Sequence, residues 1–355
     1  MASKKLDLVI TNRNGNSFYN RSQHFYAQKV CSSLSSIYGD KKVILLPSGM
    51  ASIATVLHVI NMDANWSKFN IVYGNELYCD TPRTINYMNQ HYTQCNLHKI
   101  DVANDDEVNS VFRNKINQDL PTVLYIESCS NPSGYVFNFD LIKEIRANVK
   151  KLTVVVDNTW LSGAVFNPFD FDIDFVVTSL TKYYSAGACI GGALIGKSED
   201  KLMDYASEWV RVMGFHVSPF NCRLIFDNMK NLSDRINKSY DLTLRITKFL
   251  KENNVNVTFV GLDNHKSNKY ISKYFNNLGP SVFTIKMNMS KSKVDKMLKK
   301  CEHFPYETSF GSKYSKFDPW PLRISENETV IRFSVGYEDT YENMVSKFSK
   351  MFNIN

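Results

Sequence analysis

Short apolar runs that each end at a polar side chain are the feature that most constrains the fold of this chain. The runs are residues 123–126, 152–156 and 175–178, followed by Glu127, Asp157 and Ser179. Continuous rather than alternating apolar runs are typical of parallel strands that are covered on both faces. Helical patterns separate the runs, which predicts an α/β fold with a mostly parallel central sheet.

The pattern changes after about residue 222. Long helical patterns at residues 200–212 and 221–252 precede strand-like stretches, and an amphipathic helix is expected after Glu338. The strand-like stretches are residues 256–260, 281–286 and 330–335. We therefore expect three parts: a polar N-terminal arm of residues 1–35, a larger domain of residues 36–222, and a smaller C-terminal α/β domain of residues 223–355.

The charge balance argues against nucleic acid as a partner. The chain has 355 residues and a formal net charge of +7. Its densest lysine cluster, at residues 291–300, has the spacing of the solvated face of a helix. Nucleic-acid binding needs a basic patch together with a recognisable module, and the sequence has no such module.

Cysteine usage and the apolar runs predict a location. The seven cysteines have long spacings and no CxxC, which argues against a disulfide framework and for a reducing compartment. The histidines form no metal-ligand pattern, so we expect no metal site. No run suits a membrane span or a signal peptide. These features predict a cytoplasmic protein without a membrane partner.

Polar residues gather where the predicted strands end, which is where open α/β sheets bind ligands. Ser48-Gly49-Met50 precedes a helix, where free N–H groups favour an anion, although a serine N-cap alone gives the same pattern. Asp157 follows a buried run and must be paired, serve a cation or cap a helix. Ser179, Thr181 and Lys182 offer two hydroxyls to a phosphate and one nucleophilic amine, although a lone lysine there is more often solvated. Together they supply what pyridoxal phosphate needs from a protein.

At these residues the chain resembles the Cys/Met-metabolism pyridoxal-phosphate enzymes, the group of cystathionine γ-synthase, cystathionine γ- and β-lyases and methionine γ-lyase. The segments that carry the resemblance occur in family order from about residue 19 to residue 340. They are LLPSGMASIATV, NELYCDTPR, YIESCSNPSG, VVVDNTWLSGAVFNPFDFDIDFVVTSLTKYYSAG, VSPFNCRLI, TSFGS and VIRFSVGYED. The resemblance implies the aspartate-aminotransferase-like fold (fold type I) and pyridoxal 5'-phosphate as the cofactor.

The resemblance also implies a role for each matching residue. Lys182 is similar to the Schiff-base lysine, Asp157 to the acid that holds the pyridine nitrogen, and Tyr78 to the tyrosine that stacks on the ring and moves protons. The other residues that match cofactor-binding positions are Asn131 for the ring hydroxyl, and Gly49, Met50, Ser179 and Thr181 for the phosphate.

Further matches concern the substrate and a neighbouring subunit. Arg332 is similar to the arginine that binds the carboxylate of a small amino-acid substrate, Ser309 to a serine that orients that end of the site, and Arg83 to an arginine that meets a distal carboxylate. Tyr19 and Arg21 resemble the arm residues that reach the phosphate of a neighbouring subunit. The resemblance thus implies a homo-oligomer, a dimer of dimers, with active sites shared across subunits.

The implied activity is that of a carbon–sulfur lyase or a transferase, by γ-elimination or γ-replacement on a homoserine-derived or thioether amino acid. A β-lyase acting on cystathionine or cysteine, and a regulatory protein that binds the cofactor without turnover, remain open. The chain departs from the family pattern at Tyr78-Cys79-Asp80, at residues 185–188 and at Tyr314, where the family has a glutamate. These departures concern specificity, and Arg83 is equally consistent with plain surface charge.

Overall fold

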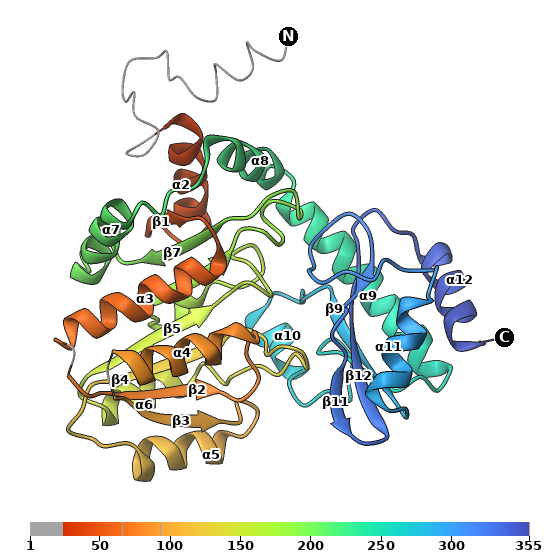
Figure 1. Cartoon of the computed structure of the whole chain (residues 1–355), viewed down its shortest axis with the longest axis horizontal. Coiled ribbons are helices and arrows are strands. Elements are labelled where there is room, and N and C mark those ends of the chain that lie inside the picture. Colours follow the sequence, from red (N-terminus) through yellow and green to blue (C-terminus); the bar gives the residue numbers. More distant parts are fainter. Residues whose placement is uncertain (1–23, 66, 93, 355) are drawn as a thin grey trace. The chain divides into compact units, whose positions relative to one another are not determined.

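The computed structural model describes residues 24–65, 67–92 and 94–354. The chain forms two compact units (Figure 1). The first unit contains the described residues up to Ser130 together with Val136–Lys230. The second contains Asn131–Tyr135 and the chain from Asn231 onward. The short segment Asn131–Tyr135 therefore leaves the first unit to join the second.

A seven-stranded sheet forms the centre of the first unit, in the order β1-β7-β6-β5-β4-β2-β3. Strand β7 is antiparallel to both its neighbours, and the ladders among β6, β5, β4, β2 and β3 are parallel. The strands are β1 (Lys42–Leu46), β2 (Asn70–Gly74), β3 (Asn96–Ile100), β4 (Thr122–Glu127), β5 (Leu152–Asp157), β6 (Phe175–Ser179) and β7 (Gly192–Gly196). The sheet is mostly parallel, as the apolar runs predict.

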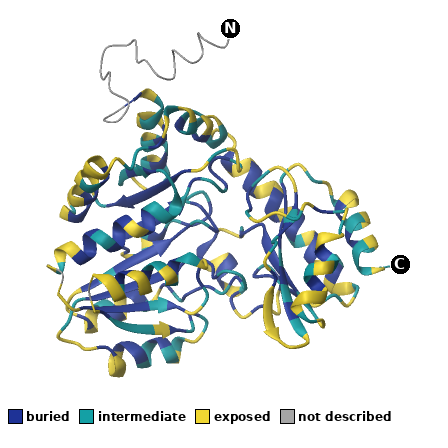
Figure 2. Cartoon of the chain, viewed as in Figure 1, coloured by how far each residue is buried: buried dark blue, intermediate teal, exposed yellow. Residues whose placement is uncertain are grey.

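Burial explains why the predicted runs become strands. All six residues of β4 are buried, as are five of the six in β5 (Figure 2). Helix α3 (Gly49–Asp63) packs against β6, β7 and helix α7 (Lys201–Met213), and buries Ile53, Val56 and Ile60. The other helical elements of the unit are α4 (Asp80–His91), α5 (Asp105–Ser110), η1 (Val111–Lys115), α6 (Leu141–Asn148), η2 (Pro168–Phe171) and α8 (Pro219–Met229).

Part of the expected N-terminal arm is a helix. Helix α2 (Phe25–Ile37) buries Val30 and Leu34 and packs against α8 and β1. His24 caps it by accepting a hydrogen bond at Nδ1 from the Ala27 amide. Residues 24–35 therefore belong to the packed part of the first unit, because the apolar spacing within them supports a buried helical face.

A smaller sheet forms the second unit, in the order β10-β12-β9-β8, with β11 paired to β12. All of its ladders between these strands are antiparallel. The strands are β8 (Val257–Thr258), β9 (Val282–Met287), β10 (Lys316–Phe317), β11 (Leu322–Ser325) and β12 (Glu328–Ser334). The helices are α9 (Leu232–Glu252), α10 (Lys269–Tyr274), α11 (Lys291–Lys299) and α12 (Tyr341–Phe352).

Four helical expectations can be compared directly with the structure. The helix expected at residues 200–212 is confirmed as α7. The single helical pattern expected over residues 221–252 is wrong: the helix breaks at Lys230 and Asn231, where the first unit ends, and asparagine favours such breaks by competing for backbone hydrogen bonds. The lysine-rich helix is confirmed, because α11 buries Val294 and Leu298 and exposes its lysines. The final amphipathic helix is confirmed as α12.

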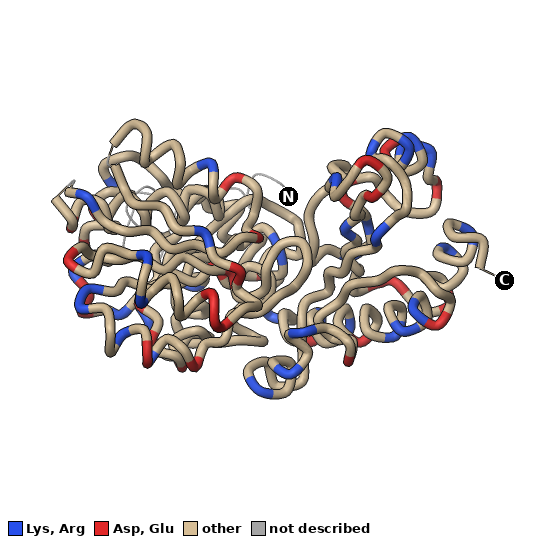
Figure 3. Tube along the Cα trace, turned by 90° about the horizontal axis from the view of Figure 1, so that it is seen from below, with Lys and Arg blue, Asp and Glu red and all other residues tan. Residues whose placement is uncertain are grey.

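Basic and acidic side chains are interspersed along the chain (Figure 3). Many of them form ion pairs on one helix or between neighbouring elements, such as Arg113–Glu144 at 2.5 Å. No helix of the described ranges has both the length and the apolar character that a membrane crossing requires.

Candidate active site

The start of α3 lies directly against the end of β6. Ser48 caps α3, because its Oγ accepts a hydrogen bond of 3.1 Å from the Ala51 amide. A Cβ on Gly49 would lie 2.9 Å from Cβ of Ser179, so only glycine permits this close approach. The first N–H groups of a helix have no partner within it, and the helix dipole favours an anion there. The N-terminus of α3 and the Ser179 hydroxyl thus share one place suited to a phosphate.

Asp157 ends β5 and is joined to Ser179 through Thr159. The Asp157 Oδ1 accepts hydrogen bonds from the Thr159 amide at 2.9 Å and from the Thr159 hydroxyl at 2.5 Å. The Ser179 amide in turn donates to the Thr159 Oγ1 at 2.8 Å. Thr159 is a site residue that the sequence reasoning missed, and its position two residues after the aspartate was the available signal.

Burial leaves Asp157 in need of a cation. Desolvation raises the pKa of its carboxyl from 3.8 to about 6, while the hydrogen bonds from Thr159 and the charge of Lys182 act to lower it. A carboxylate held in this way gains from a buried cation, and a protonated pyridine nitrogen is such a group. Glu127, its partner in the β4–β5 register, is also buried.

Lys182 lies in the turn that follows β6. Its side chain is half-buried, and it is close enough to Asp157 for its charge to act on that carboxyl. The turn is fixed by Thr181, whose Oγ1 accepts a hydrogen bond of 3.2 Å from the Gly191 amide. The Thr181 hydroxyl is therefore engaged with backbone, whereas Ser179 faces Gly49.

Tyr78 follows β2, and its backbone is anchored on the neighbouring strand end. Its amide donates a hydrogen bond of 2.5 Å to Oε1 of the buried Glu127. Tyr78 is 39% exposed, so it is accessible to a ligand. Glu127 thus has a positioning role for Tyr78, which its place at a strand end could have suggested.

The second unit holds its own group of predicted residues around Arg332 of β12. The Arg332 Nη1 donates to the Asn131 Oδ1 at 2.9 Å, which brings together two residues that lie far apart in the sequence. Nη2 donates to Asp318 Oδ2 at 2.5 Å and to Thr308 Oγ1 at 3.3 Å. Sequence reasoning did not find Asp318 or Thr308.

Ser309 is next to Thr308 and has a φ of 109°, outside the regions that residues with a Cβ favour. Strained backbone of this kind gathers at functional sites.

The remaining predicted residues stand apart. Arg83 forms an ion pair of 2.7 Å with Asp80 one helical turn away, and its side chain is 78% exposed. Met50 lies in the first turn of α3 and is half-buried. Tyr19 and Arg21 lie outside the described residues.

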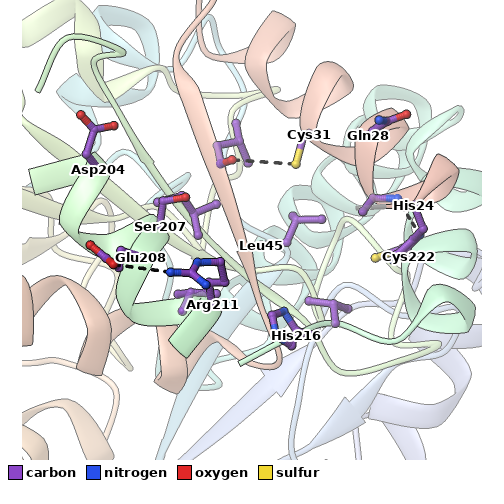
Figure 4. A pocket seen from close by; sticks show the side chains of 15 residues that line it. His24, Gln28, Cys31, Leu45, Asp204, Ser207, Glu208, Arg211, His216 and Cys222 are labelled. Carbon is purple, nitrogen blue, oxygen red and sulfur yellow. Dashed lines mark hydrogen bonds and ion pairs between the residues drawn. The ribbon is translucent and has the colours of Figure 1, made fainter. Parts of the chain in front are cut away.

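A pocket of about 690 Å³ lies elsewhere in the first unit (Figure 4). Its wall includes His24, Cys31, Glu208, Arg211 and Cys222, and none of the predicted site residues. All seven cysteines are free thiols. Within the described ranges, no group of three or more His, Cys, Asp or Glu side chains is arranged to hold a metal ion.

The sheet and the residues at its carboxyl edge define a class of protein. A helix N-terminus beside a serine, a buried aspartate and a lysine in the next turn are the parts of a pyridoxal-phosphate site on an α/β sheet. The residues fit the cofactor, since Gly49 keeps the anion site open and Asp157 is poised for a cation.

Comparison with known proteins identifies the family. The model of the Cys/Met metabolism PLP-dependent enzymes matches residues 2–352, and the chain belongs to this family. The chain is 28% identical over 323 residues to a cystathionine beta-lyase of Schizosaccharomyces pombe, covering 86% of this chain and 79% of that protein. It is 25% identical over 349 residues to a cystathionine gamma-lyase of Saccharomyces cerevisiae, covering 91% and 84%.

Solved structures share the fold. A cystathionine gamma synthase from Xanthomonas oryzae pv. oryzae superposes with a TM-score of 0.81 at 20% identity, covering 97% of this chain and 90% of that one. A Campylobacter jejuni structure named as an O-acetylhomoserine (thiol)-lyase, with N'-pyridoxyl-lysine-5'-monophosphate, has a TM-score of 0.79 at 20% identity and covers 99% and 90%. The expected fold type I is confirmed. The chain is a PLP-dependent enzyme of sulfur amino-acid metabolism, and pyridoxal phosphate is its cofactor.

Proposed function

We propose that the chain catalyses γ-elimination or γ-replacement on a homoserine-derived or thioether amino acid, with Lys182 as the residue that binds the cofactor. The observation that carries the proposal is the link from Asp157 through Thr159 to Ser179, with Gly49 opposite and Lys182 in the following turn. These residues come from one rigid sheet edge, so one ligand can meet all of them. Pyridoxal phosphate supplies an electron sink for the charge that develops on the substrate.

Each residue then has a task that its position supports. The α3 N-terminus and Ser179 hold the phosphate, because both offer hydrogen-bond donors to an anion. Asp157 pairs with the ring nitrogen and keeps it protonated. The amine of Lys182 takes a proton from the substrate, and the exposed phenol of Tyr78 gives one to the leaving group. Glu127 fixes the Tyr78 backbone for that transfer.

In the second unit, Arg332 binds the substrate carboxylate, and Ser309 orients that end of the site. Asn131 uses its carbonyl oxygen on Arg332, which leaves its amide N–H groups for the ring hydroxyl. Arg83 serves the distal end of the substrate, within reach of the Tyr78 loop. The substrate is a small amino acid, and the active assembly is a cytoplasmic homo-oligomer, in which Tyr19 and Arg21 complete the site of a neighbouring subunit. The family membership and the free cysteines support these statements.

The test of this proposal is the Lys182→Ala variant. We expect it to lose turnover and the yellow absorbance of the lysine-bound cofactor, because no other amine replaces Lys182 in that turn. Lys197→Ala, which removes a half-exposed lysine after β7, is the matched control and is expected to keep both. Activity and cofactor absorbance that survive Lys182→Ala would overturn the assignment.

A screen of reaction products identifies which reaction the enzyme catalyses. Cystathionine, cysteine, methionine and acylated homoserines are incubated with the enzyme, with and without a thiol acceptor. The proposal expects 2-oxobutyrate or a new thioether. Pyruvate would instead show β-elimination, and cofactor binding without any keto acid or thioether would favour a regulatory protein.

A further inference from the structure

The sheet of the second unit places a carboxylate directly opposite Arg332. Strand β10 pairs with β12 in the register Lys316↔Ser334 and Phe317↔Phe333. The next pair in this register is Asp318 and Arg332, and the Asp318 amide donates to the Arg332 carbonyl at 2.9 Å. Their side chains form an ion pair of 2.5 Å, and each is only 14% exposed. Strand register places these two residues directly opposite each other, with their Cβ atoms as neighbours on one face of the sheet.

The ion pair occupies the part of the guanidinium that an anion needs. An arginine binds a carboxylate most strongly through two parallel hydrogen bonds from one edge, either Nη1 with Nη2 or Nε with Nη2. Nη2 belongs to both of these edges. In the structure Nη2 already donates to Asp318 Oδ2 at 2.5 Å and to Thr308 Oγ1 at 3.3 Å, and Nη1 donates to Asn131.

Asp318 is itself held in place. Its Oδ1 accepts a hydrogen bond of 2.9 Å from the Trp320 amide, and its Oδ2 accepts one of 2.9 Å from the Thr308 hydroxyl. The next residue, Pro319, is fixed through its carbonyl, which accepts a hydrogen bond of 2.6 Å from the Tyr306 hydroxyl. The carboxylate therefore cannot swing away without losing several contacts.

We propose that Asp318 is a specificity-determining residue that occupies the anion-binding edge of Arg332, so that a substrate carboxylate competes with it. The inference rests on the proposed role of Arg332 in binding that carboxylate. It follows that small amino acids bind weakly through their carboxylate. An isosteric uncharged group, such as a carboxamide, does not have this disadvantage. The competing interpretation is that Asp318 only stabilises the sheet as a cross-strand ion pair.

The experiment measures binding to the holoenzyme rather than turnover. The probes are L-alanine and L-alaninamide, which share the amine and the methyl group and differ only in carboxylate against carboxamide. Binding is followed by calorimetry and by the cofactor absorbance. In Asp318→Asn, we expect the Kd of L-alanine to fall by about tenfold, the size of one charge-assisted hydrogen bond, and the Kd of L-alaninamide to stay within about twofold.

A matched control comes from the same sheet. Lys286 and Glu328 form an ion pair of 2.5 Å on β9 and β12, so Glu328→Gln also exchanges a carboxylate for an amide. We expect this variant to leave both Kd values unchanged. An unchanged or higher Kd for L-alanine in a folded Asp318→Asn protein would overturn the inference and leave Asp318 as a structural residue.

A second variant and the result for the wild-type protein complete the test. If Asp318→Asn does not fold, the second variant is Thr308→Val, which removes one donor to Asp318 and one partner of the Arg332 Nη2. A lower Kd for L-alanine in this variant supports the inference, and an unchanged Kd overturns it. A wild-type holoenzyme that binds neither probe would overturn the proposed function instead, and the Lys182→Ala result reports on that function independently.

Discussion

Asp157 shows at the residue scale how burial prepares a site for a ligand. A carboxylate in the body of a fold normally has a cationic partner, because removing a charge from water is costly. Asp157 accepts hydrogen bonds from the amide and the hydroxyl of Thr159, and the charge of Lys182 acts on it from nearby. These do not offset burial, since the pKa of the carboxyl stays raised. In the proposed function, the pyridinium of the cofactor would supply the missing charge.

The raised pKa of Asp157 predicts a pH dependence of stability in the cofactor-free protein. Its pKa is about 6 in the folded state and 3.8 ordinarily, so the folded chain binds the extra proton between these values. The free energy of unfolding therefore falls as pH rises from about 4 to about 6, by up to about 3 kcal/mol from this group. Urea unfolding at several pH values measures it.

Asp157→Asn is expected to remove that pH dependence, because an amide does not titrate. Asp119→Asn, which changes an exposed aspartate of the same unit, is the control and is expected to keep it. A wild-type protein whose stability rises over this pH range relative to Asp157→Asn would show that the carboxylate is stabilised as an anion.

Single site residues were predictable where they belong to a recognisable motif. Their hydrogen-bond partners were not predictable. Asp157, Ser179 and Lys182 follow apolar runs that mark strand ends, so their meeting at one edge follows from the parallel order of the strands. Thr159 and Asp318 act through hydrogen bonds that depend on a turn and on a strand register. The sequence does not show which residues of β10 and β12 lie opposite each other. The pairing of Asp318 with Arg332 is therefore known only from the structure.

At the scale of elements, the contact between the α3 N-terminus and the end of β6 is the one on which the proposed phosphate site depends. Gly49→Ala would place a Cβ 2.9 Å from Cβ and 3.2 Å from Cα of Ser179. Because backbone lies behind that contact, the helix has to move away, at a cost of about 1–3 kcal/mol in the free energy of unfolding. The proposed phosphate site would widen as the helix moves, and we expect pyridoxal-phosphate affinity to fall by about tenfold or more.

Gly196→Ala provides the comparison for that change. Gly196 lies at the end of β7 that is farther from Ser179. A Cβ there would meet the flexible side chain of Met203 at 2.7 Å. We expect some loss of stability and no change in cofactor affinity, both measured by urea unfolding and cofactor titration. Equal affinity in wild type and Gly49→Ala would show that the phosphate is bound elsewhere.

Strands were predictable where the apolar run is continuous; burial alone is not the criterion, because all five residues of β7 are buried as well. The runs that became β4, β5 and β6 are continuous and apolar, whereas β3 (Asn96–Ile100) is an edge strand of mixed polarity and β7 contains two glycines. Neither β3 nor β7 has a clear period in the sequence, so neither was predicted. The sequence of helix α2 is typical of an exposed arm, because its polar residues outnumber the two residues that it buries.

At the scale of the whole molecule, the chain divides its proposed tasks between two compact units. The residues proposed to hold phosphate, ring nitrogen and aldehyde lie in the first unit. The residues proposed for the substrate carboxylate lie in the second. Asn131 links the two tasks, because the segment Asn131–Tyr135 leaves the sequence of the first unit and joins the second, where Asn131 accepts from Arg332.

This division predicts that cofactor binding stabilises the first unit more than the second. A ligand that binds only the folded form adds about 2.7 kcal/mol at a concentration of a hundred times Kd, which slows amide exchange through unfolding by about a hundredfold. We expect that slowing for the buried strands β4, β5 and β6, whose ends carry the site. Amides of β9 and β12 are expected to slow less, because Asn131 is the one residue of their unit that is proposed to bind the cofactor. Hydrogen exchange of the cofactor-free and cofactor-bound protein measures both sets, with the Lys182→Ala variant as the control that should show little slowing in either. Equal slowing of the two sheets would mean that the units unfold as one, and slowing confined to β9 and β12 would place the cofactor in the second unit.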